Sequence, residues 1–442
     1  MNRYAIASVS FAGIFLLASP GGAQSKSAVA SEVEAVYASS AALYQDLHLH
    51  PELSSHETQT AAKLAPQLKE LGYDVITGVG GTGIVAVLKN GSGPTVMLRT
   101  ELDALPVVEA TGFAFASKVR TKDDAGNDVG VMHACGHDLH MASWMGTARI
   151  MAGSRKTWSG TLVLIGQPAE ETGAGANAMI KDGLLTRFPR PDFALAVHDD
   201  ARRPAGEIAF HAGPALSNAD AVTVHIYGKG GHGARPETTI DPIVIAARTV
   251  LALQTIVSRE MNPFDPAVIT VGSIHGGTKN NIIPDEVVLQ LTVRSFTKPV
   301  REHLFASIDR IVKAEAMAAG ATKTPTIERL NTADALVNDS ALTKRVGAAL
   351  IRQMGPTHAM EGNAEMVSED FSAFALAGIP SLQMRVGAIE QGRFDAAMKS
   401  GETLPSLHSS TFLPDLELTM KATIQAEVIS LRELMAPSQR RS

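Results

Sequence analysis

The sequence contains a single cysteine, few aromatic residues and no block of like charge. One cysteine in 442 residues excludes an internal disulfide, and with it a disulfide-stapled fold. Lysine and arginine total 39 against 45 aspartate and glutamate residues, which gives a formal net charge of −6. A mildly acidic chain without basic runs argues against nucleic acid and anionic lipid as partners. The hydrophobic content of 45% is typical of a soluble globular protein.

Long apolar runs are also scarce, and the most prominent one lies at the N-terminus. Arg3 precedes an apolar run from Val9 to Ala18, and small residues follow up to Ala23. This layout predicts a signal peptide over residues 1–23 and an exported protein, periplasmic or secreted. The alternative is a membrane anchor, but the run is shorter than the ~20 residues that a span needs. No later segment is expected to cross a bilayer, and no membrane partner is expected after processing.

The remaining chain is too long for one ordinary core, so two domains are expected. Three continuous apolar runs predict buried parallel strands, and helical patterns between them predict an α/β sheet covered on both faces. Ligands of such sheets bind beyond the carboxyl ends of the strands. Polar side chains follow all three runs and should meet at one edge: Glu101 and Asp103 after 95–99, Glu170 and Glu171 after 161–166, and His198 after 193–197. The predicted helices are 58–71 and 140–151.

The middle of the chain has a different pattern. Alternating apolar residues predict half-buried strands, and their order with two helices is β-α-β-β-α-β, the ferredoxin-like plan. We therefore predict a catalytic domain in two parts, 24–212 and 331–442, interrupted by an inserted α+β domain at 213–330. The predicted strands of the insert are 220–228, 267–274, 287–295 and 324–330, its helices are 242–259 and 299–320, and a further strand of the first sheet is predicted at 380–386.

The stretch MHACGHDLHMA, residues 132–142, places the only cysteine between histidines. A free cysteine is most often a small buried apolar residue. An exposed thiol in an exported protein would oxidise, whereas a metal would hold Cys135 as a protected thiolate. His133 and His137, two residues away on either side, favour metal ligation.

The adjacent Glu170 and Glu171 suggest two separate roles. On an extended segment neighbouring side chains point in different directions, so one carboxylate can bind metal while the other handles protons. Elsewhere such a pair would be a solvated turn. A site of Cys135, His137, Glu171 and His198 suits zinc, and also cobalt or manganese. A second metal needs another ligand, and the last third of the chain offers His408, which by itself would be interpreted as a surface histidine.

In combination, these motifs resemble a family of dinuclear metal amidohydrolases and peptidases. The family includes aminoacylases, glutamate-releasing carboxypeptidases, hippurate hydrolases and indole-acetyl-amino-acid hydrolases, and the Cys-Gly-His pair is typical of the last two. The resemblance covers nearly the whole predicted mature chain. The motifs are His48-Leu-His-Pro-Glu-Leu-Ser54, Leu98-Arg-Thr-Glu-Leu-Asp-Ala-Leu-Pro106, His133-Ala-Cys-Gly-His-Asp138, Gln167-Pro-Ala-Glu-Glu171, Gly228-Lys-Gly-Gly-His232, Asn281-Ile-Ile-Pro284, Ser368-Glu-Asp-Phe371 and Leu407-His-Ser409.

The resemblance implies a fold, a cofactor and a role for individual residues. The fold is a mixed, mostly parallel sheet flanked by helices, as in zinc peptidases, with the inserted domain acting as a lid or dimerisation domain. The cofactor is two divalent metal ions per subunit, zinc or manganese, with cobalt as an in vitro substitute, and the subunit is expected to form a homodimer. The family's metal ligands are matched by Cys135, His137, Glu171, His198 and His408, and its general base is matched by Glu170. His232 matches a residue that stabilises the oxyanion and is often supplied by the partner subunit. Asn281 and Arg294 match the residues that bind the substrate carboxylate, and Asp103 is expected to orient a ligand.

Two positions depart from the family pattern. Glu101 stands where an aspartate is expected, one methylene shorter, which could reposition the edge of the metal site. After His198 an apolar or aromatic residue is expected, but Asp199-Asp200-Ala-Arg-Arg203 follows, and the sequence predicts a charged rim there.

The function expected from these features is metal-dependent hydrolysis of the amide bond of N-acyl amino acids or short peptides, which releases a free amino acid. One alternative is an exported dipeptidase or carboxypeptidase, which would accept a free amine on the acyl side. Another is an inactive binding protein on the same scaffold, but this would require a defect among the ligands or at Glu170, and none is present in the sequence.

Overall fold

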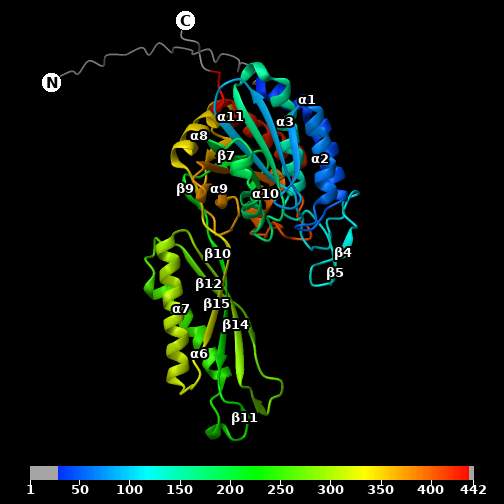
Figure 1. Ribbon diagram of the computed structural model, residues 1–442. Coiled ribbons are helices and arrows are strands. Elements are labelled where there is room, and N and C mark those ends of the chain that lie inside the picture. The colour runs from blue at the N-terminus through cyan, green and yellow to red at the C-terminus, as the bar shows by residue number, and fades with distance from the viewer. Residues whose placement is uncertain (1–27, 438–442) are drawn as a thin grey trace, which may run out of the picture.

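The computed structural model describes residues 28–437, so the predicted signal peptide lies outside the described residues. The chain forms two lobes arranged along one long axis (Figure 1). The larger lobe contains the N-terminal and C-terminal parts of the chain, and the smaller, elongated lobe is formed by the middle.

An eight-stranded mixed sheet organises the larger lobe. Its inner strands β6, β3, β7 and β18 are mutually parallel, while β1 and β2 pair antiparallel at one end. The expected fold class is therefore confirmed. In spatial order the strands are β1 (Asp74–Val79), β2 (Gly83–Asn90), β6 (Gly160–Gln167), β3 (Thr95–Glu101), β7 (Phe193–Pro204), β18 (Ser381–Ile389), β8 (Ile208–Phe210) and β17 (Ala359–Glu361).

Helices cover both faces of this sheet, which explains why its inner strands are continuously apolar. Along β3, for example, Leu98 enters the core beneath one helical layer and Met97 enters the core beneath the other. The first layer contains α1 (Ala28–Leu49), α2 (Thr58–Glu70), α3 (His137–Gly153), α8 (Ser340–Met354) and α11 (Leu416–Leu434); the second contains α4 (Gly175–Lys181), α5 (Leu184–Arg187) and α9 (Ser372–Leu376).

The smaller lobe is a four-stranded antiparallel sheet with two helices on one face (Figure 1). The sheet order β12-β14-β10-β15 is the one expected for a ferredoxin-like β-α-β-β-α-β chain. Asp241 caps the first helix by accepting a hydrogen bond from the backbone N–H of Ile243. The elements are β10 (Ala219–Tyr227), α6 (Pro242–Thr255), β12 (Ala267–His275), β14 (Glu286–Ser295), α7 (Lys298–Ala318) and β15 (Thr326–Ala333).

Shorter elements connect these parts. The β9–β16 pair belongs to the segments that enter and leave the smaller lobe, and the β11–β13 pair lies at the far end of that lobe (Figure 1). They are β4 (Arg120–Lys122), β5 (Asp128–Gly130), β9 (Gly213–Leu216), β11 (Gly231–His232), β13 (Ile282–Ile283), β16 (Leu336–Asn338) and α10 (Gln391–Ser400).

Three local expectations from the sequence were wrong. Helix α3 begins at His137 rather than near His140, because Gly136 adopts a left-handed conformation (φ 74°) and turns the chain directly into the helix. Strand β7 continues to Pro204, so His198 lies inside the strand and not after it. The third expectation was that no segment after the N-terminal run could cross a bilayer. Within residues 28–437, the helix Pro242–Glu260 is long and apolar enough to do so by length and composition alone, and 33% of its apolar window is buried in the structure.

Candidate metal centre

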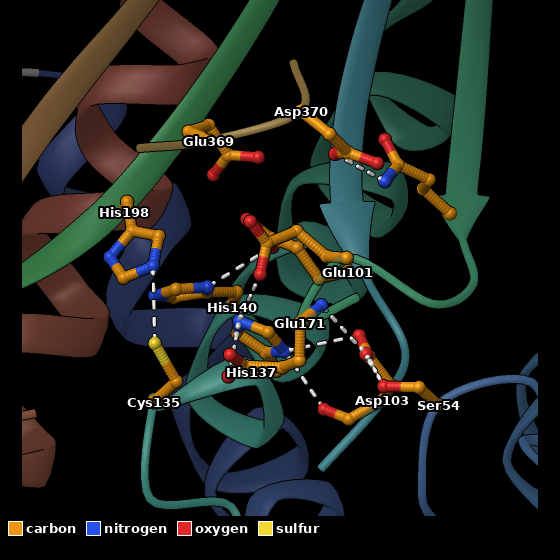
Figure 2. A network of polar contacts seen from close by, with 12 residues as sticks. Ser54, Glu101, Asp103, Cys135, His137, His140, Glu171, His198, Glu369 and Asp370 are labelled. Carbon is orange, nitrogen blue, oxygen red and sulfur yellow. Dashed lines mark hydrogen bonds and ion pairs between the residues drawn. The ribbon is translucent and has the colours of Figure 1, made fainter. Parts of the chain in front are cut away.

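The carboxyl ends of three neighbouring strands bring the candidate ligands to one edge of the larger sheet. Asp103 follows β3, Glu170 and Glu171 follow β6, and His198 lies in β7. Cys135 precedes α3 and His137 is its first residue. Figure 2 shows Cys135, His137, Glu171 and His198 converging from these different elements. These side chains therefore lie together at one edge of the larger sheet, as the sequence predicted.

The cysteine lies between two histidines that are distant in the sequence. Cys135 Sγ is 3.5 Å from His198 Nε2 and 3.3 Å from His408 Nε2. His408 Nε2 is in turn 3.5 Å from Glu171 Oε2. The His408 backbone adopts positive φ, and its N–H donates to the Ala134 carbonyl at 2.8 Å, which places the C-terminal loop against the cysteine. All five residues proposed as ligands from the sequence therefore lie together.

Two facing atoms of this cluster are buried without a hydrogen-bond partner within the described residues. They are His137 Nε2 and Glu171 Oε1, which lie 3.9 Å apart, too far for a hydrogen bond. Buried polar atoms are normally satisfied, so two unsatisfied atoms facing each other indicate a missing bridging group. A divalent cation between a nitrogen and a carboxylate oxygen would satisfy both.

Backbone carbonyls set the orientation of the two inner imidazoles. His137 Nδ1 donates to the Asp103 carbonyl at 2.8 Å, and His198 Nδ1 donates to the Asp199 carbonyl at 2.9 Å. In each neutral ring the proton is therefore on Nδ1 and the Nε2 lone pair faces the cluster. Donors of this kind, with a thiol and a carboxylate, fit a transition-type divalent metal ion.

Asp103 supports two of the candidate ligands at once. Its carbonyl holds His137, while its carboxylate accepts hydrogen bonds from Ser54 Oγ at 2.6 Å and from the Glu171 backbone N–H at 3.0 Å (Figure 2). The residue is fully buried. These contacts support the orienting role expected for Asp103.

The adjacent glutamates lie in a turn rather than on the extended segment that the sequence suggested. Ala169 precedes them with φ of 51°, and the Gly173 N–H donates to the Glu170 carbonyl at 2.7 Å. The turn still separates the two carboxylates: Glu171 groups with Cys135 and His137, whereas Glu170 groups with Glu369 and Asp370. Glu170 Oε2 nevertheless remains 3.9 Å from His137 Nε2, at the margin of the candidate metal cluster.

The charges around the cluster favour a cation. Burial lowers the pKa of His137, but its hydrogen bond to Asp103 and the nearby Glu101 outweigh burial and raise it to about 10. Burial raises the pKa of Cys135 well above its usual range, and burial raises that of Glu171 to about 7. The metal-free cluster therefore binds protons at neutral pH, in the place that a metal cation would occupy.

A buried charge network, to which the sequence patterns assigned no role, lies beside the cluster. Arg99 is fully buried and forms ion pairs with Glu101, with Glu369 at 2.7 Å and with Asp370 at 3.1 Å. Glu101, one of the two departures from the family pattern, also pairs with His140 Nδ1 at 3.1 Å. The signal available in the sequence was Arg99 inside an apolar run, together with the Ser368-Glu-Asp-Phe371 motif.

The charged rim predicted after His198 is only partly a rim. Asp199 and Asp200 are buried within β7, and the Asp199 N–H donates to His140 Nε2 at 3.0 Å. A Cβ at Gly136 would collide with the Asp199 carboxylate, so the Cys-Gly-His motif needs its glycine here. Arg202, in contrast, is exposed over 62% of its side chain.

A cleft of about 850 Å³ opens over the candidate metal cluster. Arg294, from the end of β14, lines this cleft together with Cys135, Glu170, Glu171, His198 and His408. His232 and Asn281 do not: both are exposed in the β11–β13 region at the far end of the smaller lobe (Figure 1). The structure thus brings Arg294 to the site and leaves His232 and Asn281 beside each other at a distance from it.

Comparisons with known proteins identify relatives that are peptidases and hydrolases, in agreement with a metal centre in this cleft. The model of peptidase family M20/M25/M40 matches residues 97–402. Thermostable carboxypeptidase 2 of Saccharolobus solfataricus is 34% identical over 391 residues, which covers 87% of this chain and 93% of the relative. Hippurate hydrolase of Campylobacter jejuni is 37% identical over 273 residues, covering 62% of this chain and 68% of the relative.

A solved structure extends the similarity to the fold. The YXEP protein of Bacillus subtilis, a dinuclear metal-binding peptidase from family M20, superimposes with a TM-score of 0.72 at 27% identity. The similarity covers 90% of this chain and 98% of that one. Both lobes therefore have a counterpart of known structure.

Proposed function

Because this chain belongs to peptidase family M20/M25/M40 and is a metal-dependent amidohydrolase, we propose that it releases an amino acid from an N-acyl amino acid or a short peptide. The observation that carries the proposal is the convergence of Cys135, His137, Glu171, His198 and His408, with Glu170 at the margin of the cluster. The hippurate hydrolase relative favours an N-acyl amino acid, and the carboxypeptidase relative favours a peptide as the second candidate.

The side chains of the cleft fit hydrolysis of a linear amide. Divalent metal ions, when bound, supply an acidified water and polarise the scissile carbonyl. Glu170 would accept the proton of the attacking water and return it to the leaving amine. Arg294 would pair with the carboxylate of the substrate through two parallel hydrogen bonds. These roles follow from the family resemblance, and the positions of Glu170 and Arg294 on the cleft support them.

A homodimer is proposed as the working assembly. Neither His232 nor Asn281 lines the cleft, and β11, which contains His232, lies at the far end of the smaller lobe (Figure 1), so a movement of the lobes or a second subunit would be needed to bring His232 to a cleft. The smaller lobe also has an open sheet edge at β12 and exposed apolar residues on α6, among them Val244 and Leu251. Covering an exposed apolar face and an unpaired strand edge is what a second copy would achieve.

His232 has the geometry of a hydrogen-bond donor. Its Nδ1 accepts the backbone N–H of Ala234 at 3.0 Å, so in the neutral ring the proton is on Nε2. The ring is exposed, with that proton available to a group outside its own lobe. This supports the proposed role of His232 in stabilising the oxyanion of the reaction.

The metal and the compartment are further parts of the proposal. The thiol, imidazole and carboxylate donors favour zinc or manganese, two ions per subunit, with cobalt as a substitute. Metal analysis of the purified protein would test this. Export to the periplasm or the medium is proposed from residues 1–23, and sequencing the N-terminus of the secreted protein would test it.

The test of the reaction is a panel of small amides with the metal-loaded protein. Hydrolysis of N-acetyl and N-benzoyl amino acids is expected, and a free amine on the acyl side should be tolerated only if the protein is a dipeptidase or carboxypeptidase. Replacing the substrate carboxylate by a primary amide should reduce kcat/KM by at least about tenfold, because Arg294 is left unpaired. A loaded protein that cleaves none of these amides would contradict the proposed function.

A further inference from the structure

Three arginines and two carboxylates form a second charged cluster on the wall of the cleft. Arg202 pairs with both Asp200 and Glu365, Arg203 pairs with Asp200 at 3.1 Å, and Arg385 pairs with Glu365 at 3.1 Å. Among the direct ion pairs, three guanidinium groups thus share two carboxylates, and the buried Asp199 carboxylate adds a longer-range attraction to Arg385. Asp200 and Glu365 are themselves buried, and Arg385 is far less exposed than Arg202, so solvent screens the charge of Arg385 less than that of Arg202.

Arg385 is the member of this cluster that lies beside a candidate metal ligand on the neighbouring strand. On β18 it is in register with His198 on the neighbouring strand β7, so their backbones are about 4.8 Å apart. Its side chain is only 14% exposed and lines the cleft. The Nε–H of Arg385 has no hydrogen-bond partner among residues 28–437 and is buried. A guanidinium that is buried and incompletely paired beside a cleft is a site for an anion.

The cluster also adjoins the proposed carboxylate binder. Arg294 Nη1 donates to the Met366 carbonyl at 3.3 Å, and the preceding residue, Glu365, holds Arg202 and Arg385. Two consecutive residues, Glu365 and Met366, therefore contact the charged cluster and Arg294 on the same wall of the cleft. Arg202, Arg294 and Arg385 all line the same cleft, so one small ligand can reach both groups.

We propose that Arg385, with Arg202, forms a second anion subsite, and that the preferred substrates are N-acyl amino acids carrying a second carboxylate. This inference rests on the proposed function, in which Arg294 holds the first carboxylate. The second carboxylate can come from the side chain of an acidic amino acid or from a dicarboxylic acyl group, since both present the same anion. A bidentate guanidinium–carboxylate pair discriminates strongly against an uncharged isostere where the guanidinium is mostly buried, as that of Arg385 is.

The first experiment measures kcat/KM for pairs of substrates that differ only in the second carboxylate. N-acetyl-aspartate against N-acetyl-asparagine tests the side-chain source, and N-succinyl-alanine against its succinamoyl analogue tests the acyl source. The native enzyme should prefer the acid by about tenfold or more in at least one pair. A ratio near one in both pairs would overturn the second subsite while leaving the amidohydrolase function intact.

The second experiment assigns the preference to residues. Arg385→Gln should reduce the acid-to-amide ratio by about tenfold, and Arg202→Gln should reduce it less because Arg202 is more exposed. Arg203→Gln is the matched control: this arginine belongs to the same cluster but does not line the cleft, so the ratio should be unchanged. If Arg385→Gln lowers kcat/KM equally for the acid and the amide of a pair, Arg385 has a structural role or binds the first carboxylate. This result would refute the proposal.

Binding provides a readout that does not depend on turnover. In the metal-loaded Glu170→Gln protein, calorimetry should show tighter binding of the acid than of the amide, with the difference lost on adding Arg385→Gln. If Arg385→Gln does not fold because Glu365 loses one of its two arginine partners, the charge-balanced Arg385→Gln/Glu365→Gln protein replaces it. Absence of hydrolysis together with selective binding would reject the proposed reaction and keep the subsite, whereas unselective binding would reject the subsite.

Discussion

At the scale of single residues, the adjacent Glu170 and Glu171 differ in their surroundings although they share a turn. Glu171 faces His137 and His408, whereas Glu170 groups with Glu369 and Asp370. Glu170→Gln should keep its metal and lose at least ~10²–10⁴-fold of kcat, since a general base is removed. Glu171→Gln should lose metal as well. Metal analysis and turnover of both variants, with the exposed Glu402→Gln as control, would decide; two variants as active as the native protein would exclude these roles.

The same scale determines how metal binding depends on pH. In the metal-free protein the raised pKa values of Cys135, Glu171 (about 7) and His137 (about 10) mean that protons occupy the cluster at neutral pH. Binding a metal must displace these protons, so metal affinity should rise as pH increases from about 6 to 9. Calorimetry of zinc binding in buffers of different ionisation enthalpy counts the protons released.

The Cys135→Ser variant is the control for the number of protons that zinc binding releases. A neutral hydroxyl replaces a thiol that must ionise, so about one proton fewer should be released and zinc should bind more weakly. Affinity that does not change with pH, or a proton count that the serine variant shares with the native protein, would remove the cysteine from the ligand set.

At the scale of elements, the packing of α11 against α3 contains a buried acid that forms no ion pair with the residues the structure describes. Glu427 on α11 is fully buried and accepts a hydrogen bond from Thr147 Oγ1 on α3 at 2.6 Å. Burial raises its pKa from the ordinary value of 4.5 to about 8. The folded protein therefore favours the neutral acid, so stability is lost as pH rises above about 4.5, and the loss levels off near pH 8.

Glu427→Gln should accordingly stabilise the protein more at pH 8 than at pH 5, because the amide keeps the hydrogen bond and cannot ionise. A gain of order 1–3 kcal/mol at pH 8 is expected. The difference in Tm between variant and native protein at the two pH values measures it. Glu417→Gln, an exposed change on the same helix, is the control and should show no such pH dependence. A gain of equal size at both pH values would mean that Glu427 is already ionised in the folded state.

The elements also show how far patterns along the chain predict structure. The continuous apolar runs 95–99, 161–166 and 193–197 are the cores of β3, β6 and β7, because strands covered on both faces need apolar residues at every position. Their ends were less predictable. The start of α3 depends on the left-handed Gly136 packed against Asp199, a contact between residues 63 positions apart that no local pattern reports.

At the scale of the whole molecule, β11, which contains His232, lies at the end of the smaller lobe that points away from the larger lobe with the candidate metal ligands (Figure 1). His232→Ala should reduce kcat without changing metal content, since no candidate ligand lies in that lobe. Mixing inactive His232→Ala with inactive Glu170→Gln tests where the histidine acts. If it acts across a dimer, each mixed dimer has one intact site and recovers up to about half of the native activity.

Two outcomes would revise this assignment. Mixed dimers that recover nothing would place His232 in the site of its own chain, reached by closure of the lobes. A fully active His232→Ala would remove the residue from the reaction. The mixing experiment needs a demonstration that subunits exchange, for which a mass-tagged subunit suffices.

The sequence by itself determined the fold class and predicted the candidate ligand residues and the carboxylate pair, because these depend on short-range patterns: apolar periodicity, and polar residues placed directly after buried strands. It also singled out Cys135, since a lone cysteine with a histidine two residues away on either side favours metal ligation. The tertiary structure alone decided which of these groups meet. It brought His408 to within 3.3 Å of Cys135, left His232 and Asn281 at the far end of the smaller lobe, and buried Asp199 inside β7. It also placed Arg385 beside His198 and left its Nε–H without a partner within residues 28–437. The physical reason is that hydrogen bonding, desolvation and charge pairing depend on distances in space, and residues 135 and 408 or 198 and 385 become neighbours only when the sheet and its loops have assembled.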